Sequence, residues 1–334
     1  MGVFATVLAY GVIQSAPKAH AETVSNSPDV ISSAHHKTNR ADTYYVIPPK
    51  NFDPQNASDA ELKTFGFPKR PKDSKQLLSW KESMKHAKKF VVPTFTNTNK
   101  VNAQYTYTSP NWSGYEQEEY STHQFDDVES KWTVPSVSSS KSNTDSSAWV
   151  GIGGDSSLSS TWKLIQAGTE QDKGSSSTNY YFWHEELSYS AGNPEVKVTS
   201  IACRPGDNVL VSVSYSSGDV HYFLEDTTLN TYTQFTVTNK SAYYKGNSAE
   251  YIMERPEIGN SYSYLANYDF TSFWGARASY SGSSTMYTPG EWSSNGHILD
   301  KLNMNDGNLL TSTGTLYSKD FTNDAFGVTW QGYH

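Results

Sequence analysis

The sequence predicts an all-β protein, built as an antiparallel β-sandwich of the jelly-roll type and preceded by a partly helical N-terminal segment. Composition is the first observation: the 334 residues include 23 Tyr and 9 Trp but only 18% charged residues, which favours strands over helices. The second is the series of short alternating segments, separated by turn residues, that begins at residue 105. These segments show no βαβ alternation, which favours a sandwich over an α/β fold.

The clearest predicted strands lie on either side of a turn. Residues 195–203 and 208–215 flank the sequence Arg-Pro-Gly-Asp at 204–207, where Pro presets the first turn angle and Gly accepts the positive φ of the second. Valines occupy alternate positions in the second strand, which places them on one face. Two further strands are expected at residues 221–226 and 231–238.

The first 21 residues have the features of a secretory signal peptide. An apolar stretch is followed by Ala19-His20-Ala21, a small-x-small cleavage pattern. The stretch is too short to span a bilayer. The opening Met-Gly-x-x-x-Thr also matches a myristoylation pattern, but the apolar run behind it favours export. We therefore expect a signal peptide at residues 1–21, a secreted protein and no membrane partner.

Charge divides the remainder of the chain into two parts. Residues 22–105 hold about 13 basic and 8 acidic side chains, whereas residues 106–334 hold about 12 basic and 26 acidic ones. Parts with opposite net charge should attract each other. We expect a basic N-terminal segment at residues 22–104 and a β-sandwich domain at residues 105–334, joined by a processing boundary between residues 90 and 105.

Two helices are expected in the basic segment. Ser58-Asp59-Ala60-Glu61 is a capping-box pattern that opens the first. In the second, residues 73–90, apolar residues recur at helical spacing beside a row of lysines, Lys81, Lys85, Lys88 and Lys89. This row is explained equally well as a solvated face. The sharper hypothesis is an inhibitory prosegment whose lysines bind carboxylates of the sandwich at neutral pH and are released when acid protonates them.

Several functions are disfavoured by what the sequence lacks. A net charge of −8 and a pI near 5.6 argue against nucleic-acid binding, which needs a dense basic face. The single Cys203 rules out an intramolecular disulfide. The sequence contains no His-Glu-x-x-His, no paired Cys-x-x-Cys and no Gly-x-Ser-x-Gly. We therefore expect no metal, no cofactor and no covalent nucleophile, and a monomer.

The remaining candidates are a carboxylate and a carboxamide on strands. Gln166 shares a strand face with Gly168, and small residues beside it would let a substrate backbone approach. Glu250 alternates with apolar residues in its own segment. Residue type alone favours an ordinary explanation for both, as polar side chains on a hydrated sheet face.

Six short blocks, in this order, resemble the glutamic peptidases, also called eqolisins, and together they cover most of residues 110–256. Any one block is weak, but their order and spacing make the combination specific. The blocks are Asn111-Trp112-Ser113-Gly114, Trp132-Thr133-Val134-Pro135, Ala148-Trp149-Val150-Gly151-Ile152, Ile165-Gln166-Ala167-Gly168, Tyr181-Phe182-Trp183-His184-Glu185 and Ala249-Glu250-Tyr251-Ile252.

The resemblance implies a lectin-like β-sandwich and a pepstatin-insensitive acid endopeptidase that acts on polypeptides. It places the catalytic glutamine at Gln166 and the catalytic glutamate at Glu250. Glu254 is the alternative glutamate if the alignment with the family shifts by one strand repeat. In this reading Glu250 is the general base on a water molecule and Gln166 stabilises the oxyanion. The sequence departs from the family at Gly153 and Glu170, where the family commonly has Asp. The cysteines of the fungal members are absent, as expected for a prokaryotic-type member.

Other side chains are assigned to the substrate groove. Trp112, Trp149 and Trp183 are either cleft walls for an extended peptide or core residues of the sandwich. Glu170 and Glu185 are expected either to support the catalytic pair by hydrogen bonds or to be ordinary surface carboxylates.

Two alternative functions stay open at the level of sequence. One is a carbohydrate-binding, lectin-like module, because the same sandwich and its aromatic face suit sugar stacking. The other is a glycosidase that uses Glu185 and Glu250 as acid and base.

Overall fold

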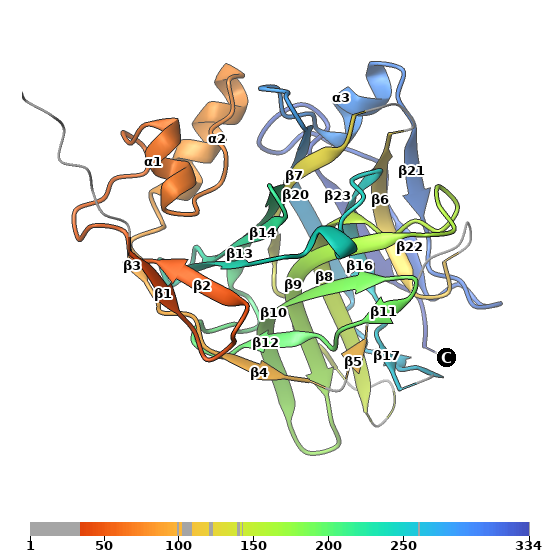
Figure 1. Cartoon of the computed structure of the whole chain (residues 1–334). Helices are drawn as coiled ribbons and strands as arrows, with labels where there is room; N and C mark the ends of the chain where they lie inside the picture. Colours follow the sequence, from red (N-terminus) through yellow and green to blue (C-terminus); the bar gives the residue numbers. More distant parts are fainter. Residues whose placement is uncertain are drawn as a thin grey trace, which may run out of the picture. The chain divides into compact units, whose positions relative to one another are not determined.

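The computed structural model describes residues 34–98, 100–101, 109–119, 123–138, 141, 143–259 and 261–333. Within it, residues 33–334 form one compact unit, dominated by strands (Figure 1). The signal peptide expected at residues 1–21 lies outside the described residues. No helix in these ranges is long and apolar enough to cross a membrane.

Two ten-stranded sheets make up the sandwich, and nearly all neighbouring strands run antiparallel, as predicted. Sheet A begins with two strands of the N-terminal segment and ends with two strands from the C-terminal part of the chain. Its order is β1 (His35–Lys37), β2 (Thr43–Val46), β15 (Thr231–Val237), β14 (Asp219–Asp226), β13 (Asn208–Ser216), β7 (Phe125–Thr133), β20 (Phe270–Tyr280), β23 (Phe326–Trp330) and β22 (Thr311–Thr313), with β3 (Lys89–Phe90) parallel to β15.

Sheet B carries the candidate site. Its order is β21 (Leu299–Leu302), β6 (Trp112–Glu118), β16 (Ser248–Glu254), β8 (Thr144–Gly153), β9 (Lys163–Lys173), β10 (Thr178–Ser188), β12 (Val196–Val198) and β4 (Phe95–Asn97), with β11 (Ala191–Gly192) beside β10 and β19 (Tyr264–Leu265) parallel to β8. A three-stranded sheet joins β18 (Ser261–Tyr262), β17 (Glu257–Ile258) and β5 (Lys100–Val101).

The sandwich core lies between the two sheets. Ile165 and Ala167 of β9 belong to one buried apolar cluster with valines and phenylalanines of sheet A. Trp132 of β7 reaches across the core and donates its indole N–H to the hydroxyl of Thr169 on β9, at 2.8 Å. Because side chains alternate along a strand, the intervening residues of β9, Gln166 among them, point away from this core.

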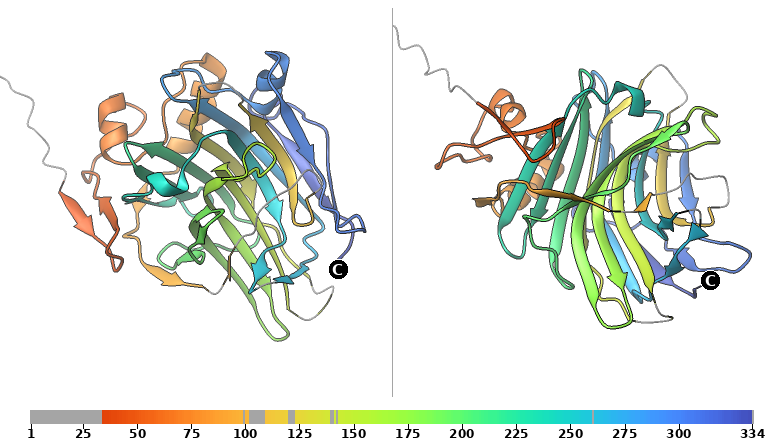
Figure 2. Two further views of the ribbon diagram at one scale, coloured as in Figure 1. Left: turned by 45° about the vertical axis from the view of Figure 1, so that its right-hand side comes forward. Right: turned by 60° about the horizontal axis from the view of Figure 1, so that its bottom comes forward.

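The N-terminal segment, meaning the described residues 34–98 and 100–101, adds strands to both sheets and packs its helices against the outer face of sheet A. It contains α1 (Asp59–Thr64) and α2 (Ser74–Met84), which lie beside β13 and β14 in the views of Figure 2. Apolar residues of both helices and of the chain around them join residues of β13, β14 and β15 in a second core: Val46, Leu62, Phe65, Phe67, Trp80, Met84 and Ala87 pack with Leu210, Phe223 and Tyr232. The segment is therefore an integral part of the compact unit.

The predicted helices form, with one difference in length. Ser58 and Glu61 make the expected capping box at α1, and the carboxylate of Asp73 caps α2 by accepting from two backbone amides. The second helix was expected to reach residue 90 but ends at Met84. Beyond it the chain extends so that Lys89 and Phe90 pair with β15, where Phe90 packs against Tyr232. Tertiary pairing thus overrides the local helical pattern.

The predicted strands agree with β13, β14 and β15 to within two residues at each end. The strand expected at residues 195–203 is shorter, because only Val196–Val198 pairs with neighbouring strands. Two short helical elements complete the fold: η1 (Ser241–Tyr243) and α3 (Pro289–Ser294).

Candidate active site

One row of cross-strand partners in sheet B holds the predicted catalytic pair. Gln166 of β9 and Glu250 of β16 are both register partners of Gly151, on the strand between them. Residues opposite each other on adjacent strands point to the same face, and two strand spacings separate the two Cα atoms by roughly 9 to 10 Å. The complete row reads Glu185, Gln166, Gly151, Glu250, Glu116 and Asp300.

Gly151 lies between Gln166 and Glu250, and neighbouring side chains pack closely over it. A Cβ atom at this position would lie 2.9 Å from the ring of Trp149, 3.0 Å from the side chain of Leu164 and 3.2 Å from the Cβ of Gln166. Any larger residue would therefore clash with these side chains.

The row lies on the face of sheet B opposite the sandwich core. Trp112, Trp149 and Trp183 belong to a separate buried cluster on this face, together with Leu164 and Ile252. The three tryptophans thus line the candidate site and do not belong to the inter-sheet core, but none has exposed surface in the full chain. Their assignment as substrate walls stays a prediction.

Glu254 has a different environment from Glu250, although it lies on the same face of the same strand. Its Oε1 accepts hydrogen bonds from Asn111 at 3.0 Å and from the indole of Trp112 at 3.1 Å, and its Oε2 accepts from the indole of Trp149 at 2.7 Å. Burial raises the pKa of Glu254 to about 8 in spite of these donors. Glu254 therefore fixes the two tryptophans, and its oxygens are already occupied.

Glu250 is buried next to other carboxylates. Burial raises its pKa well above the ordinary value; the charge of Asp155 adds to the rise, and the Ser248 hydroxyl opposes it. Neither carboxylate oxygen makes a hydrogen bond of good geometry to a described residue. The carboxylate oxygens therefore keep capacity to accept hydrogen bonds from a ligand or a water molecule.

Glu116 is the nearest acidic partner of Glu250, and sequence reasoning missed it. The two residues face each other across β6 and β16. Burial, together with the charge of Glu250, raises the pKa of Glu116 well above its ordinary value. Ionisation of both adjacent buried carboxylates is unfavourable because their negative charges repel each other, so the pair retains a proton in mild acid. Only the register places these residues together, since they are 134 positions apart in the chain.

Gln166 is oriented by a hydrogen bond to Glu185, a buried carboxylate on the neighbouring strand. The Nε2 of Gln166 donates to Oε2 of Glu185 at 2.9 Å, and the Oε1 of Gln166 is buried without a hydrogen-bond partner among the described residues. The carboxamide therefore keeps one N–H and its carbonyl oxygen for a ligand. Neither Gln166 nor Glu250 has exposed surface, so this part of the row is closed to solvent.

Glu170 does not contact the pair but binds a lysine of the N-terminal segment. The Nζ of Lys100 lies 2.6 Å from Oε1 of Glu170 and 3.3 Å from Oδ1 of Asp145, and it also pairs with Asp172. Burial would lower the pKa of Lys100, but these three carboxylates raise it well above the ordinary value. The carboxylate oxygens lie within 4.8 Å of one another, close enough to hold a cation between them.

Three lysines of the predicted row do not bind the sandwich carboxylates. They lie beyond the end of α2, where Lys85 is the C-cap residue and Lys88 and Lys89 follow it. All three are exposed, and Lys85 pairs with Glu82. The hypothesis of a lysine row against carboxylates is therefore wrong for these three side chains. The segment binds acidic groups through Lys100 instead, which no helical pattern could indicate.

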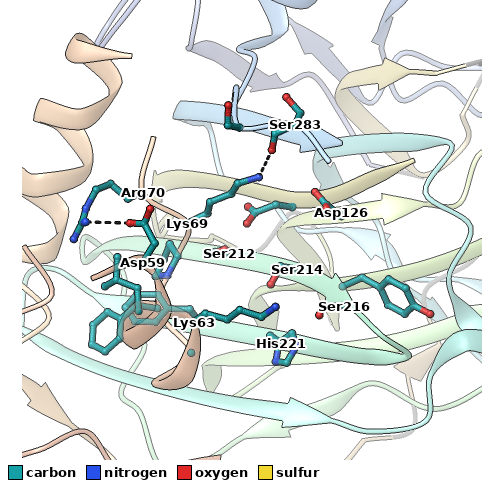
Figure 3. Close-up of a pocket in the computed structure, with 18 of the residues that line it drawn as sticks. Asp59, Lys63, Lys69, Arg70, Asp126, Ser212, Ser214, Ser216, His221 and Ser283 are labelled. Carbon is teal, nitrogen blue, oxygen red and sulfur yellow. Dashed lines mark hydrogen bonds and ion pairs between the residues drawn. The ribbon is translucent and has the colours of Figure 1, made fainter. Parts of the chain in front are cut away.

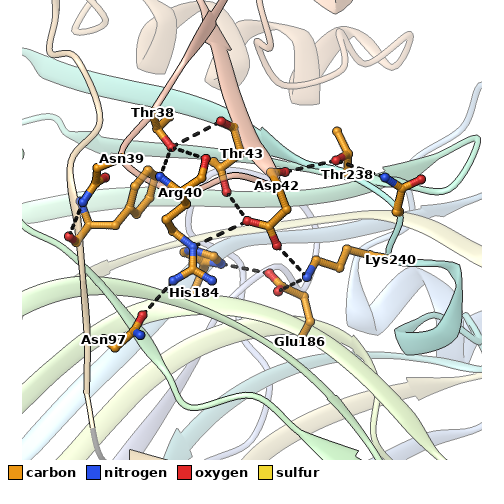
Figure 4. Close-up of polar contacts among 12 residues, drawn as sticks. Thr38, Asn39, Arg40, Asp42, Thr43, Asn97, His184, Glu186, Thr238 and Lys240 are labelled. Atoms are coloured by element: carbon orange, nitrogen blue, oxygen red, sulfur yellow. Dashed lines mark hydrogen bonds and ion pairs between the residues drawn. The ribbon is translucent and has the colours of Figure 1, made fainter.

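A second polar link between the N-terminal segment and the sandwich involves an aspartate of the segment. Asp42 pairs with Lys240 at 3.0 Å, and Lys240 lies 3.4 Å from Glu186, which in turn contacts His184 at 2.9 Å (Figure 4). Burial opposes ionisation of Asp42, but Lys240 outweighs it and lowers the pKa of Asp42. This link is present at neutral pH and is lost as the pH falls through the lowered pKa.

A separate cavity lies between the N-terminal segment and sheet A. Its volume is about 490 Å³, and basic residues of the segment face polar residues of β7, β13 and β14 across it (Figure 3). Lys69 closes one side by donating to the carbonyl of Ser283 at 2.7 Å. No residue of the cross-strand row lines this cavity, so it belongs to the interface of the segment rather than to the candidate site.

Comparison with known families and structures identifies the class of protein. The Peptidase A4 family model matches residues 110–323, more than half of the chain, so fold and match together define a peptide-bond hydrolase. The chain belongs to the Peptidase A4 family, the glutamic peptidases. A search of the curated proteins finds no match.

Solved structures of glutamic peptidases share the fold. Scytalido-glutamic peptidase with a transition state analog inhibitor has a TM-score of 0.52 at 18% identity, and the alignment covers 66% of this chain and 98% of that chain. Its complex with a peptide-based transition state analog gives 0.50 at 19% identity, with the same coverage. Aspergilloglutamic peptidase from Aspergillus niger is 25% identical over 56% of this chain and 99% of its own, with a TM-score of 0.45.

Proposed function

We propose that this chain is the latent precursor of a secreted, pepstatin-insensitive acid endopeptidase in which Glu250 and Gln166 are the catalytic residues. The observation that carries the proposal is the cross-strand row: a carboxylate and a carboxamide flank a glycine on the same sheet face. Membership in the glutamic peptidase family supports the reaction class.

Glu250 acts as the general base. It takes a proton from a water molecule as that water attacks the carbonyl carbon of the scissile peptide bond, and it returns the proton to the leaving nitrogen. Glu250 must be ionised for the first step. Burial raises the pKa of Glu250 in the closed precursor, so ionisation requires that water reach the carboxylate once the N-terminal segment has left. Protonation of Glu116 and Asp155 then removes the like charges beside it.

Gln166 stabilises the negative charge that develops on the carbonyl oxygen. Its carboxamide is neutral at every pH and carries N–H donors and an oxygen acceptor on one rigid group. The hydrogen bond to Glu185 fixes one N–H, so the other points in a defined direction before substrate binds. A group fixed in advance stabilises the transition state without reorganising during the reaction.

Two features would keep the precursor inactive: Gln166 and Glu250 are buried from solvent, and the N-terminal segment is bound to the sandwich. The segment supplies edge strands to both sheets and places Lys100 on the active-site face, four positions along β9 from Gln166. The family match begins only at residue 110, after this segment. Acid protonates Asp42 and the carboxylates around Lys100, which weakens the segment's electrostatic attachment while Lys100 keeps its charge.

The test is an acid incubation of the full-length protein. At pH 3 to 4 we expect a fragment close in size to residues 105–334, followed by cleavage of denatured casein in the presence of pepstatin. Glu250→Gln is the matched inactive control and should give neither product. Casein cleavage that persists in this variant, or that pepstatin abolishes, would refute the proposal.

The glycosidase alternative has no support from the geometry. Glu185 and Glu250 are separated by three strand spacings, roughly 14 Å between Cα atoms, and Glu185 accepts a hydrogen bond from the intervening Gln166. Soluble polysaccharides in the same assay serve as a control for this alternative and for the lectin-like one.

A further inference from the structure

The acidic pocket that Lys100 fills is built into sheet B and does not belong to the N-terminal segment. Asp145 comes from β8, and Glu170 and Asp172 come from β9, so the sandwich supplies all three carboxylates. Glu170 has no exposed surface, and its Oε2 has no hydrogen-bond partner among the described residues. Within those residues, Lys100 is the cation that pairs with each of the three.

The backbone around Lys100 binds as an added strand. Asn97 and Thr96 pair with β12, and the carbonyl oxygen of Lys100 accepts from the backbone N–H of Glu195 at 2.9 Å. Lys100 also pairs with β17. An extended peptide that pairs with a sheet edge and inserts one side chain into a pocket is a general mode of peptide recognition. The segment thus shows how the sandwich binds an extended chain with a lysine.

The acidic pocket lies on the same face of sheet B as the cross-strand row, close enough for one extended peptide to contact both. Gln166 and Glu170 are four residues apart on β9 and share a face, which separates them by roughly 13 Å. An extended substrate covers this distance in about four residues. A peptide cleaved over the row would therefore place a side chain in the pocket once the N-terminal segment has left.

We propose that Asp145, Glu170 and Asp172 form a specificity subsite that binds a lysine side chain of the substrate, about four residues from the scissile bond. The ammonium group of lysine is compact and carries three donors, one for each carboxylate. Lys100 is then a substrate mimic that holds the subsite in the precursor. This subsite deepens the proposed peptidase function and rests on it, but its chemistry is testable by itself.

The first experiment needs no peptidase activity. In full-length Lys100→Ala at pH 7, n-butylammonium replaces the missing side chain, so we expect the melting temperature to rise with its concentration and then level off. n-Butanol should have no such effect, and neither should n-butylammonium in Lys100→Ala/Glu170→Gln. The subsite is overturned if n-butylammonium acts equally on both variants or on neither, or if calcium ions stabilise Lys100→Ala more strongly, which would indicate a metal site.

The second experiment measures preference in the acid-processed enzyme. Peptides with Lys, norleucine or Glu at each of five positions on either side of the cleaved bond are compared at the highest pH that permits cleavage. We expect Lys at one position to raise kcat/KM by about 10-fold over norleucine at this pH, and the ratio to fall as acid protonates the three carboxylates. Glu170→Gln should bring the ratio of kcat/KM for Lys and norleucine peptides close to 1, whereas Glu225→Gln, which changes a buried carboxylate of sheet A, is the matched control and should keep the ratio of the parent.

The outcomes separate the two proposals. Equal cleavage of all peptides would overturn the subsite and leave the peptidase assignment standing. If no peptide were cleaved, the peptidase assignment would fail, and the response to n-butylammonium would still decide whether the pocket binds an alkylammonium group.

Discussion

Substitution of Glu254 by glutamine should change how the stability of the protein depends on pH. Glu254 is fully buried, and its pKa rises from 4.5 to about 8 on folding. Between these values the folded state keeps a proton that the unfolded state has lost. A carboxyl group with a raised folded pKa therefore stabilises the fold most in acid, and the stabilisation is lost as the pH rises from about 4.5 to about 8.

The size of the effect follows from the shift. A change from 4.5 to about 8 corresponds to a loss of at most about 5 kcal/mol in the free energy of unfolding between pH 4 and pH 9. Glutamine does not titrate, so Glu254→Gln removes this part of the pH dependence. It also turns an amide N–H toward the indole N–H of Trp149, which costs about 1 to 3 kcal/mol because a donor then meets a donor.

Urea unfolding at pH 4 and at pH 8.5 measures both effects. A Glu250→Gln background, used for parent and variant alike, prevents self-cleavage. We expect Glu254→Gln to be less stable than its parent at pH 4 and equally stable or more stable at pH 8.5. An equal loss of stability at the two pH values would show that Glu254 is ionised in the folded state, and the reasoning would then be refuted.

Three further predictions concern the catalytic row and the attachment of the N-terminal segment. Glu250→Gln should lower kcat on casein at least about 100-fold, since the general base is lost, with the circular dichroism spectrum unchanged; activity near the parent level would contradict the assignment. Gln166→Glu should lower kcat about 100-fold or more and shift its pH optimum, because an ionisable group replaces neutral donors next to Glu250; full activity at an unchanged optimum would argue against an oxyanion role. Lys100→Met should raise the pH at which the precursor is processed, because the segment loses the cation that pairs with Asp145, Glu170 and Asp172. Gels across a pH series give the midpoint of processing, and Lys85→Met, at an exposed lysine, is the control. Equal midpoints for the two variants would show that Lys100 does not hold the segment in place.

Sequence patterns predicted those secondary-structure boundaries that depend on interactions between residues close together in the chain. The capping residues Ser58 and Asp73 mark the starts of α1 and α2, because a side-chain acceptor there satisfies backbone amides that no helical carbonyl can reach. The helix expected to end at residue 90 ends at Met84, because β15 offers strand partners to the residues that follow. Neighbours far away in the chain are not visible in a helical pattern.

The sequence by itself determined the strand alternation, the helix caps and the family, and with them Gln166 and Glu250 as candidates. Only the tertiary structure decided what surrounds each candidate. It placed Glu116 beside Glu250, assigned Glu170 to Lys100 rather than to the catalytic pair, and showed that Glu254 fixes two tryptophans. The physical reason is that strand register joins residues more than 100 positions apart, and burial of these joined groups, not their identity, sets their charges.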